Sequence, residues 1–173
     1  MHDAAVARTA NLLGAAALAV TDLMLAAAAS SGGVGPSAAA ALVVLRATPD
    51  LSATELGRRI GLSQPAAARM LDSMAAAGLV RRERGQGRTV PVRLTADGAR
   101  AAEDLVRARA EPLAVLVAGL DEADRAALDG LLATLLARLY DRVGSTELLC
   151  RLCDRPACTK GARCPVGAAA EGR

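Results

Sequence analysis

The sequence predicts a mainly α (α+β) fold, and three observations lead to that prediction. Of 173 residues 42 are alanine, and 53% of the chain is hydrophobic, so residues with high helix propensity dominate. Apolar residues recur at helical spacing along most of the chain, and serine, proline and glycine bound the helices that this spacing predicts. Two short runs of β-forming residues flank one glycine-rich turn, which adds a small hairpin.

The composition argues against several classes of function. With a single tyrosine, no phenylalanine and no tryptophan, the chain lacks the aromatic surface on which single-stranded nucleic acids stack. Its one histidine, His2, stands near the N-terminus, which disfavours a Ser-His-Asp hydrolase. The sequence also holds no paired carboxylates and no phosphate-binding loop. We therefore predict a binding protein, not an enzyme.

A long helix is predicted within residues 1–35. Leu12 to Ala29 is nearly continuously apolar, and Ser30 to Gly33 ends the helix. A secretion signal is the alternative interpretation, whereas a membrane span is disfavoured because alanine is only weakly apolar and Asp22 interrupts the run. We favour a cytoplasmic protein whose amphipathic helix carries one apolar stripe, formed by Leu13, Ala16, Val20 and Met24.

Three shorter helices follow. Ser37 to Arg46 supplies apolar bulk for a core, and Thr48-Pro49-Asp50 ends it. Ser52 to Glu55 has the pattern of a capping box, in which serine and glutamate each bind the other's backbone amide. Gly61 stops that short helix, and Ser63 caps the next one, with Pro65 in its first turn. Two helices so closely spaced must cross steeply, which predicts a helix-turn-helix.

The second helix of this pair would read the DNA bases. Helical spacing turns Ala67, Met70, Leu71 and Met74 inward. Arg69 points outward, where its guanidinium can bind both acceptors of a guanine, and we expect Asp72 to hold it through an i,i+3 pair. A simple surface ion pair is the alternative for these two residues. The predicted outer face is Gln64, Pro65, Ala68, Arg69 and Asp72.

A basic hairpin is predicted directly after these helices. Residues 79–84 and 89–94 flank the Gly85-Gln86-Gly87-Arg88 turn, and Pro91 restricts the second strand to an edge. Residues 58–100 hold nine arginines against three acidic residues, a local net charge of +6 in a chain of net charge +3. A solvated arginine-rich face is the alternative reading. Arg88 is suited to a minor groove, and Arg84 and Arg93 to phosphates.

Residues 52–98 resemble the winged helix-turn-helix of the MarR family of bacterial transcription regulators. The segments that carry the resemblance are SATELGRRI from Ser52, LSQPAAARMLD from Leu62, GLVRR from Gly78 and VRLTADG from Val92. The resemblance implies that Arg69 lies in the reading helix and Arg88 at the tip of the wing. Ala68 stands where the family often has a DNA-contacting serine, and Gln86 where an aspartate usually orients the wing arginine.

The flanking helices match the family in kind. Thr95 begins a helix that contains Pro112, and Asp121 begins another with a broad leucine stripe, which is more often core than binding site. Beside an apolar first helix, such a stripe favours helices shared between two subunits. The resemblance implies a homodimer that reads pseudo-palindromic double-stranded DNA. A small-molecule effector pocket between the helices would be lined by leucine, alanine and arginine.

Four cysteines stand in the last 24 residues, in a polar tail of low helix propensity. Their spacing, with two, four and five residues between them, is compatible with a zinc ion, an iron–sulfur cluster or a thiol redox switch. The predicted metal ligands are Cys150, Cys153, Cys158 and Cys164.

These observations predict four segments: an N-terminal dimerisation helix (1–35), a winged helix-turn-helix (36–100), C-terminal dimerisation helices (101–143) and a cysteine-rich tail (144–173). The function they favour is a DNA-binding transcription regulator, acting as a repressor, with metal or redox control through the tail. The alternative is a winged helix that docks an acidic protein partner.

Overall fold

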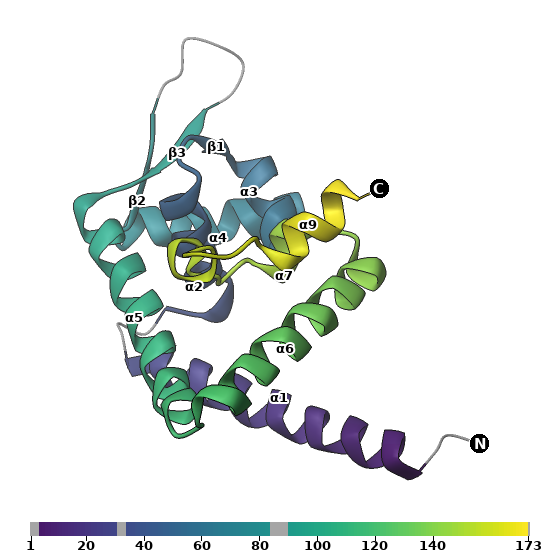
Figure 1. The fold of residues 1–173 in the computed structure, drawn as a ribbon. Coiled ribbons are helices and arrows are strands. Elements are labelled where there is room, and N and C mark those ends of the chain that lie inside the picture. The colour runs from purple at the N-terminus through teal and green to yellow at the C-terminus, as the bar shows by residue number, and fades with distance from the viewer. Residues whose placement is uncertain (1–3, 31–33, 84–89, 173) are drawn as a thin grey trace.

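The computed structural model describes residues 4–30, 34–83 and 90–172 (Figure 1). The mainly α (α+β) class is confirmed. In chain order the described elements are α1 (Ala4–Ser30), α2 (Pro36–Ala47), β1 (Leu51–Ser52), α3 (Ala53–Ile60), α4 (Gln64–Ala76), β2 (Val80–Arg82), β3 (Pro91–Leu94), α5 (Ala96–Ala118), α6 (Glu122–Val143), α7 (Thr146–Leu149), α8 (Arg155–Cys158) and α9 (Pro165–Glu171).

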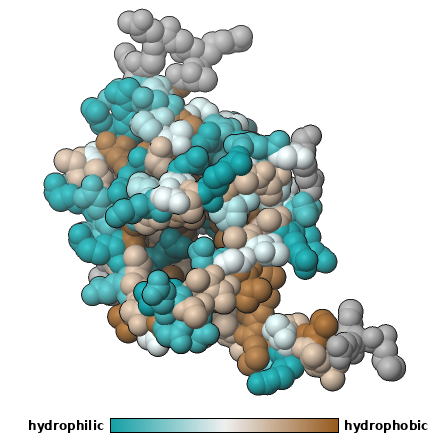
Figure 2. Space-filling model, in the orientation of Figure 1, coloured by the Kyte–Doolittle hydropathy of each residue, from teal (hydrophilic) through white to brown (hydrophobic). Residues whose placement is uncertain are grey.

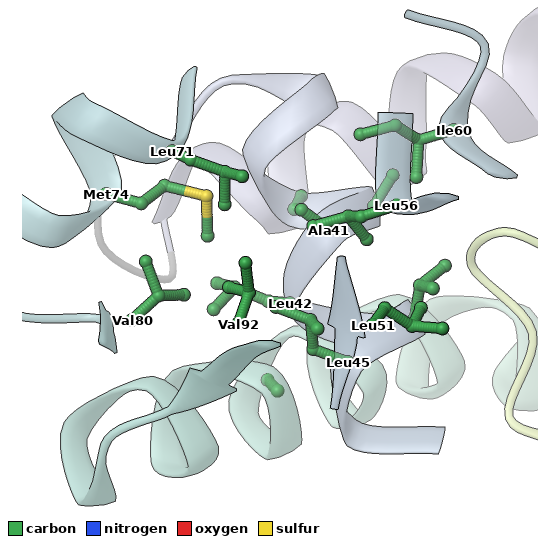
Figure 3. Close-up of a cluster of buried hydrophobic side chains, with 14 of the residues drawn as sticks. Ala41, Leu42, Leu45, Leu51, Leu56, Ile60, Leu71, Met74, Val80 and Val92 are labelled. Carbon is green, nitrogen blue, oxygen red and sulfur yellow. The ribbon is translucent and has the colours of Figure 1, made fainter. Parts of the chain in front are cut away.

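Helix α2 lies at the centre of the hydrophobic core. It packs against α3, α4, α5 and β3, and its Ala41 and Leu42 are fully buried. Leu71 and Met74 of α4 point toward it, and the small sheet closes the cluster from the other side (Figure 3). The inward face that helical spacing predicts for α4 is confirmed, because Leu71 and Met74 are buried.

The ends of the helices follow local sequence signals. Ser52 accepts a hydrogen bond from the Glu55 amide at 3.1 Å, and Gly61 ends α3 in the left-handed conformation at φ 76°. Thr95 and Asp121 cap α5 and α6 in the same way. Only half of the predicted capping box forms, because the Glu55 carboxylate binds arginines of its own helix. Ser63 occupies the N-cap of α4 without a side-chain capping bond among the described residues.

The three-stranded sheet has the order β1-β3-β2, which corrects one prediction. Pro91 does not lie on an edge strand: β3 is central, and Pro91 pairs with Ser52 of β1 on one side. A proline is tolerated there because it is the first residue of its strand and β1 is only two residues long. Its carbonyl still accepts a hydrogen bond from the Glu83 amide at 3.1 Å.

Close contact between α3 and α4 sets the geometry of the helix-turn-helix. A Cβ atom at Gly57 would lie 2.8 Å from the Cβ of Ala67, which is closer than side-chain carbons approach one another. The absence of a side chain at Gly57 therefore lets α4 cross α3 at short range, with Ala67 fully buried in the contact.

Helices α1 and α6 leave their apolar faces uncovered. In α1, residues 4–24 are long and apolar enough to cross a membrane by length and composition, and none of that window is buried. Helix α6 has no buried residue among those described, and Leu131 is 63% exposed. Apolar surface is visible along α1 in Figure 2. The long first helix and the leucine stripe are thus confirmed as elements, but a single chain does not bury them.

The C-terminal segment differs from the polar tail that we expected. It forms α7, α8 and α9, which we call the cysteine lobe (residues 145–172). Helix α7 packs against α3, and α9 packs against α6 (Figure 1). Val166 is only 2% exposed, and Leu152 packs against the main core. Low helix propensity did not prevent these short helices, because packing against the core stabilises them.

The close approach of α3 and α4 gives a first prediction. Gly57→Ala should destabilise the fold by about 1–2 kcal/mol despite the higher helix propensity of alanine, because the new methyl group overlaps Ala67. Urea unfolding followed by circular dichroism measures the change. Gly130→Ala in α6, where no atom lies within 4 Å of the new Cβ, is the matched control and should be neutral or stabilising. A Gly57→Ala variant as stable as this control would show that the crossing can relax freely.

Candidate nucleic-acid interface

The outer face of α4 presents the residues that the sequence predicts for base contact. Gln64, Pro65 and Arg69 are exposed, and Ala68 is half-buried. They occupy the N-terminal half of the second helix of the helix-turn-helix, the part that enters the major groove in proteins of this architecture. The structure therefore brings these four predicted residues together on one surface.

Asp72 does not bind Arg69, which corrects the predicted i,i+3 pair. Its carboxylate lies 2.8 Å from the guanidinium of Arg82 on β2, so that α4 is tied to the hairpin. Within the part of the chain that the structure describes, no ion pair involves Arg69. A strand partner remote in sequence thus outcompetes the nearer arginine, and the Arg69 guanidinium remains available to a ligand.

The hairpin arginines that the structure describes form ion pairs with carboxylates. Arg81 and Arg93 are directly opposite each other on β2 and β3. Glu83 bridges them, with its Oε1 2.9 Å from Arg81 and its Oε2 2.9 Å from Arg93. Asp50 also binds Arg93, and this hydrogen bond lowers the pKa of the aspartate. The predicted phosphate contact of Arg93 stays a prediction, since a phosphate would have to share this arginine with two carboxylates. Arg84 and Arg88 lie outside the described residues.

Helix α3 carries an ion cluster that the capping-box reading missed. Hydrogen bonds from Arg58 and Arg59 to Glu55 lower the pKa of that carboxyl to about 2. Arg58 also lies 3.5 Å from Glu147 of α7, a contact between residues 89 positions apart. Only the tertiary structure reveals this link, because nothing in the local pattern around Glu147 points to α3. It joins the cysteine lobe to the first helix of the helix-turn-helix.

All four cysteines line one cleft of about 410 Å³. Cys150 and Cys153 share a hydrogen bond that lowers the pKa of Cys150 and raises that of Cys153, and burial raises the pKa of Cys158. Among the described residues, no three histidine, cysteine or acidic side chains form a closed ligand set for a metal ion. The structure thus gathers the predicted ligands around one space without closing them into a coordination sphere.

Comparison with known proteins matches part of the chain to one family model. Residues 32–88 match the model of the MarR family, and no curated protein matches the chain. The chain is similar in structure to a MarR family protein from Bacillus stearothermophilus, with 24% identity, a TM-score of 0.71 and coverage of 80% of this chain and 98% of that one.

Two further solved structures are similar. A MarR family protein from Mycobacterium tuberculosis, in complex with salicylic acid, is 26% identical with a TM-score of 0.55, and the match covers 72% of this chain and 93% of that one. FabT from Streptococcus pneumoniae, in complex with DNA, is 17% identical with a TM-score of 0.70, over 79% and 98% of the two chains. With the helix-turn-helix and its hairpin in place, this chain carries a MarR family winged helix-turn-helix domain.

Proposed function

We propose that this protein is a DNA-binding transcription regulator, a repressor, that binds a pseudo-palindromic duplex as a homodimer. The observation that carries the proposal is the exposed Arg69 on the outer face of α4, with no ion-pair partner among the described residues. A guanidinium in this position can donate two hydrogen bonds to guanine in the major groove. FabT, which shares the fold, was solved in complex with DNA. A cytoplasmic location is part of the proposal.

The paired arginines of the hairpin are compatible with DNA binding. Their ion pairs lie at the surface, where such pairs contribute little to stability, so exchanging a carboxylate for a phosphate costs little. Arg81 and Arg82 have side chains 58% and 41% exposed. Arg82 contacts Asp72 of α4 from β2, so a phosphate bound there would help to orient the reading helix.

The homodimer is supported by the uncovered faces of α1 and α6. Leu18 of α1 is 71% exposed, and Leu131 and Leu132 of α6 are 63% and 45% exposed. A monomer that exposes so many large apolar side chains along two helices has a surface typical of a protein interface. A second copy related by a twofold axis could pack its own α1 and α6 against these helices. Each copy would then cover the apolar faces of the other.

A small-molecule effector is also part of the proposal. Between α1 and α6 lies a cleft of about 220 Å³ whose lining is formed by leucines and arginines, including Leu13, Leu135 and Arg138. This chemistry suits a small apolar anion, and the similar protein from Mycobacterium tuberculosis was solved in complex with salicylic acid.

Base discrimination tests the role of Arg69. Duplexes selected from a random library by the full-length protein define its preferred site, and the affinities of single-base variants of that site are then compared. Arg69→Ala should lose about 1–3 kcal/mol of discrimination at one base pair in each half-site, whereas Arg84→Ala should weaken all duplexes alike. Arg125→Ala in α6 removes one positive charge away from α4 and controls for net charge. Equal losses at every base pair for Arg69→Ala would refute its assignment as a base-reading residue.

The oligomeric state tests the second half of the proposal. Light scattering after size exclusion should give twice the 17.5 kDa of one chain. Leu132→Asp should raise the dimer dissociation constant at least about 100-fold, because it places a charge in the apolar interface. Ala126→Asp adds the same charge at an exposed position on the side of α6 away from Leu131 and Leu132, and it should leave the dimer intact. A monomeric wild-type protein, or a dimeric Leu132→Asp variant, would contradict this interface.

A further inference from the structure

We propose that the four cysteines bind a metal centre through their thiolate sulfurs, either a zinc ion or an iron–sulfur cluster, and that this centre controls the helix-turn-helix. The binding of metal stands on the cysteine lobe alone. The control of DNA affinity rests in addition on the function proposed above.

The four cysteines converge on one cleft. Cys150, Cys153, Cys158 and Cys164 come from α7 to α9 and the turns between them, yet all four line the same cleft of about 410 Å³. Four thiolates around one space are a ligand set that zinc and iron–sulfur clusters share. Sulfurs around a single zinc stand about 3.8 Å apart, given Zn–S bonds of ~2.3 Å, so zinc would draw the lobe closed. A cluster would fill more of the cleft, because irons and sulfides lie between its ligand sulfurs.

The backbone of the lobe already supports anionic sulfur. The Gly167 amide donates a hydrogen bond to the Cys164 sulfur at 3.4 Å, at the first turn of α9. The Cys153 amide closes the turn from Cys150 by binding its carbonyl at 2.9 Å, which keeps both thiols of the C-x2-C pair on the same turn. Hydrogen bonds of the first kind stabilise metal-bound thiolates and orient them.

Charge around the cleft complements such a centre. Binding of Zn²⁺ by four thiols releases four protons and leaves a zinc tetrathiolate of net charge −2. Arg59, Arg151 and Arg155 line the cleft together with one carboxylate, that of Glu147, so positive charge is in excess there. Behind it, Arg109 donates to the Leu152 carbonyl at 2.5 Å, while its buried Nε has no hydrogen-bond partner among the described residues. A dianionic centre would be stabilised by these guanidinium groups.

The cysteine lobe is attached directly to the helix-turn-helix. Residues of α2 and α3 line the same cleft as the cysteines, among them Val43, Ala47 and Arg59. Glu147, three residues before Cys150, lies 3.5 Å from Arg58 of α3. Leu148 Cδ1 sits so near the turn between α3 and α4 that a Cβ at Gly61 would lie 3.1 Å from it. Closure of the lobe around a metal therefore shifts contacts on the helix-turn-helix itself.

Metal content tests the site without DNA. The full-length protein, purified without oxygen, should contain about one zinc per chain, or iron and acid-labile sulfide in equal amounts with a visible absorption band. Cys153→Ser and Cys164→Ser should each lose at least about tenfold of the bound metal. Ala157→Ser, which adds a hydroxyl on the exposed side of α8 and keeps all four thiols, should retain it. Metal-free protein that also takes up no Zn²⁺ against a weak chelator would overturn the site.

The affinity for duplex DNA, measured with and without metal, tests whether the metal centre regulates DNA binding. The metal-loaded and chelator-stripped proteins should differ at least about tenfold in the dissociation constant for a selected duplex. Glu147→Gln should bind the same amount of metal while shrinking that difference, because the contact with Arg58 is weakened. Equal affinities of the loaded and stripped proteins would overturn the regulation of DNA binding by the metal. They would leave the metal site itself unaffected. If neither the loaded nor the stripped protein binds any duplex, both the regulation of DNA binding and the proposed function are overturned. The metal site is then tested by the metal content of the protein alone.

Discussion

Helix α2 places seven of its twelve residues in the core, and the reading module is assembled on it. Its alanines are small enough for other elements to come close, and Leu42 and Leu45 fill the space between α4, the sheet and α5. Burial of apolar surface on this scale is the main favourable term in folding a domain of this size. Helices α3 and α4 are both packed on α2, and the outward direction of Arg69 follows from the inward direction of Leu71 and Met74.

Features set by neighbours in sequence were predictable. The serine cap of α3, the glycine that ends it and the threonine cap of α5 each involve atoms within three or four residues, so pattern alone identifies them. The inward face of α4 is equally local, because helical periodicity decides it.

Features set by residues remote in sequence were not predictable. Asp72 binds Arg82 of the neighbouring strand, and Pro91 lies on a central strand because β1, a two-residue strand, pairs along its other side. The cysteine lobe folds because Val166 and Leu152 find apolar surface on the rest of the chain. In each case the deciding partner belongs to another element, and its position depends on the completed fold.

The fold determines which arginines of the interface form ion pairs with carboxylates. Of the basic block between residues 58 and 100, the described arginines of α3 and the hairpin are engaged by carboxylates, and Arg69 is left to the solvent. Glu83 reduces the repulsion between two facing arginines of the hairpin. Glu147 joins the lobe to a separate ion cluster, that of Arg58 and Glu55 on α3. A change in the lobe and a ligand on α4 can therefore influence one another through α3.

The salt dependence of binding is the decisive measurement of whether this surface binds duplex DNA. If the arginines of this surface displace counterions from the DNA, the logarithm of the association constant should fall linearly with the logarithm of salt concentration. The expected loss is at least tenfold between about 50 and 200 mM salt. Absence of duplex binding even at about 50 mM salt would contradict the account and favour the docking of an acidic protein partner by the same arginines.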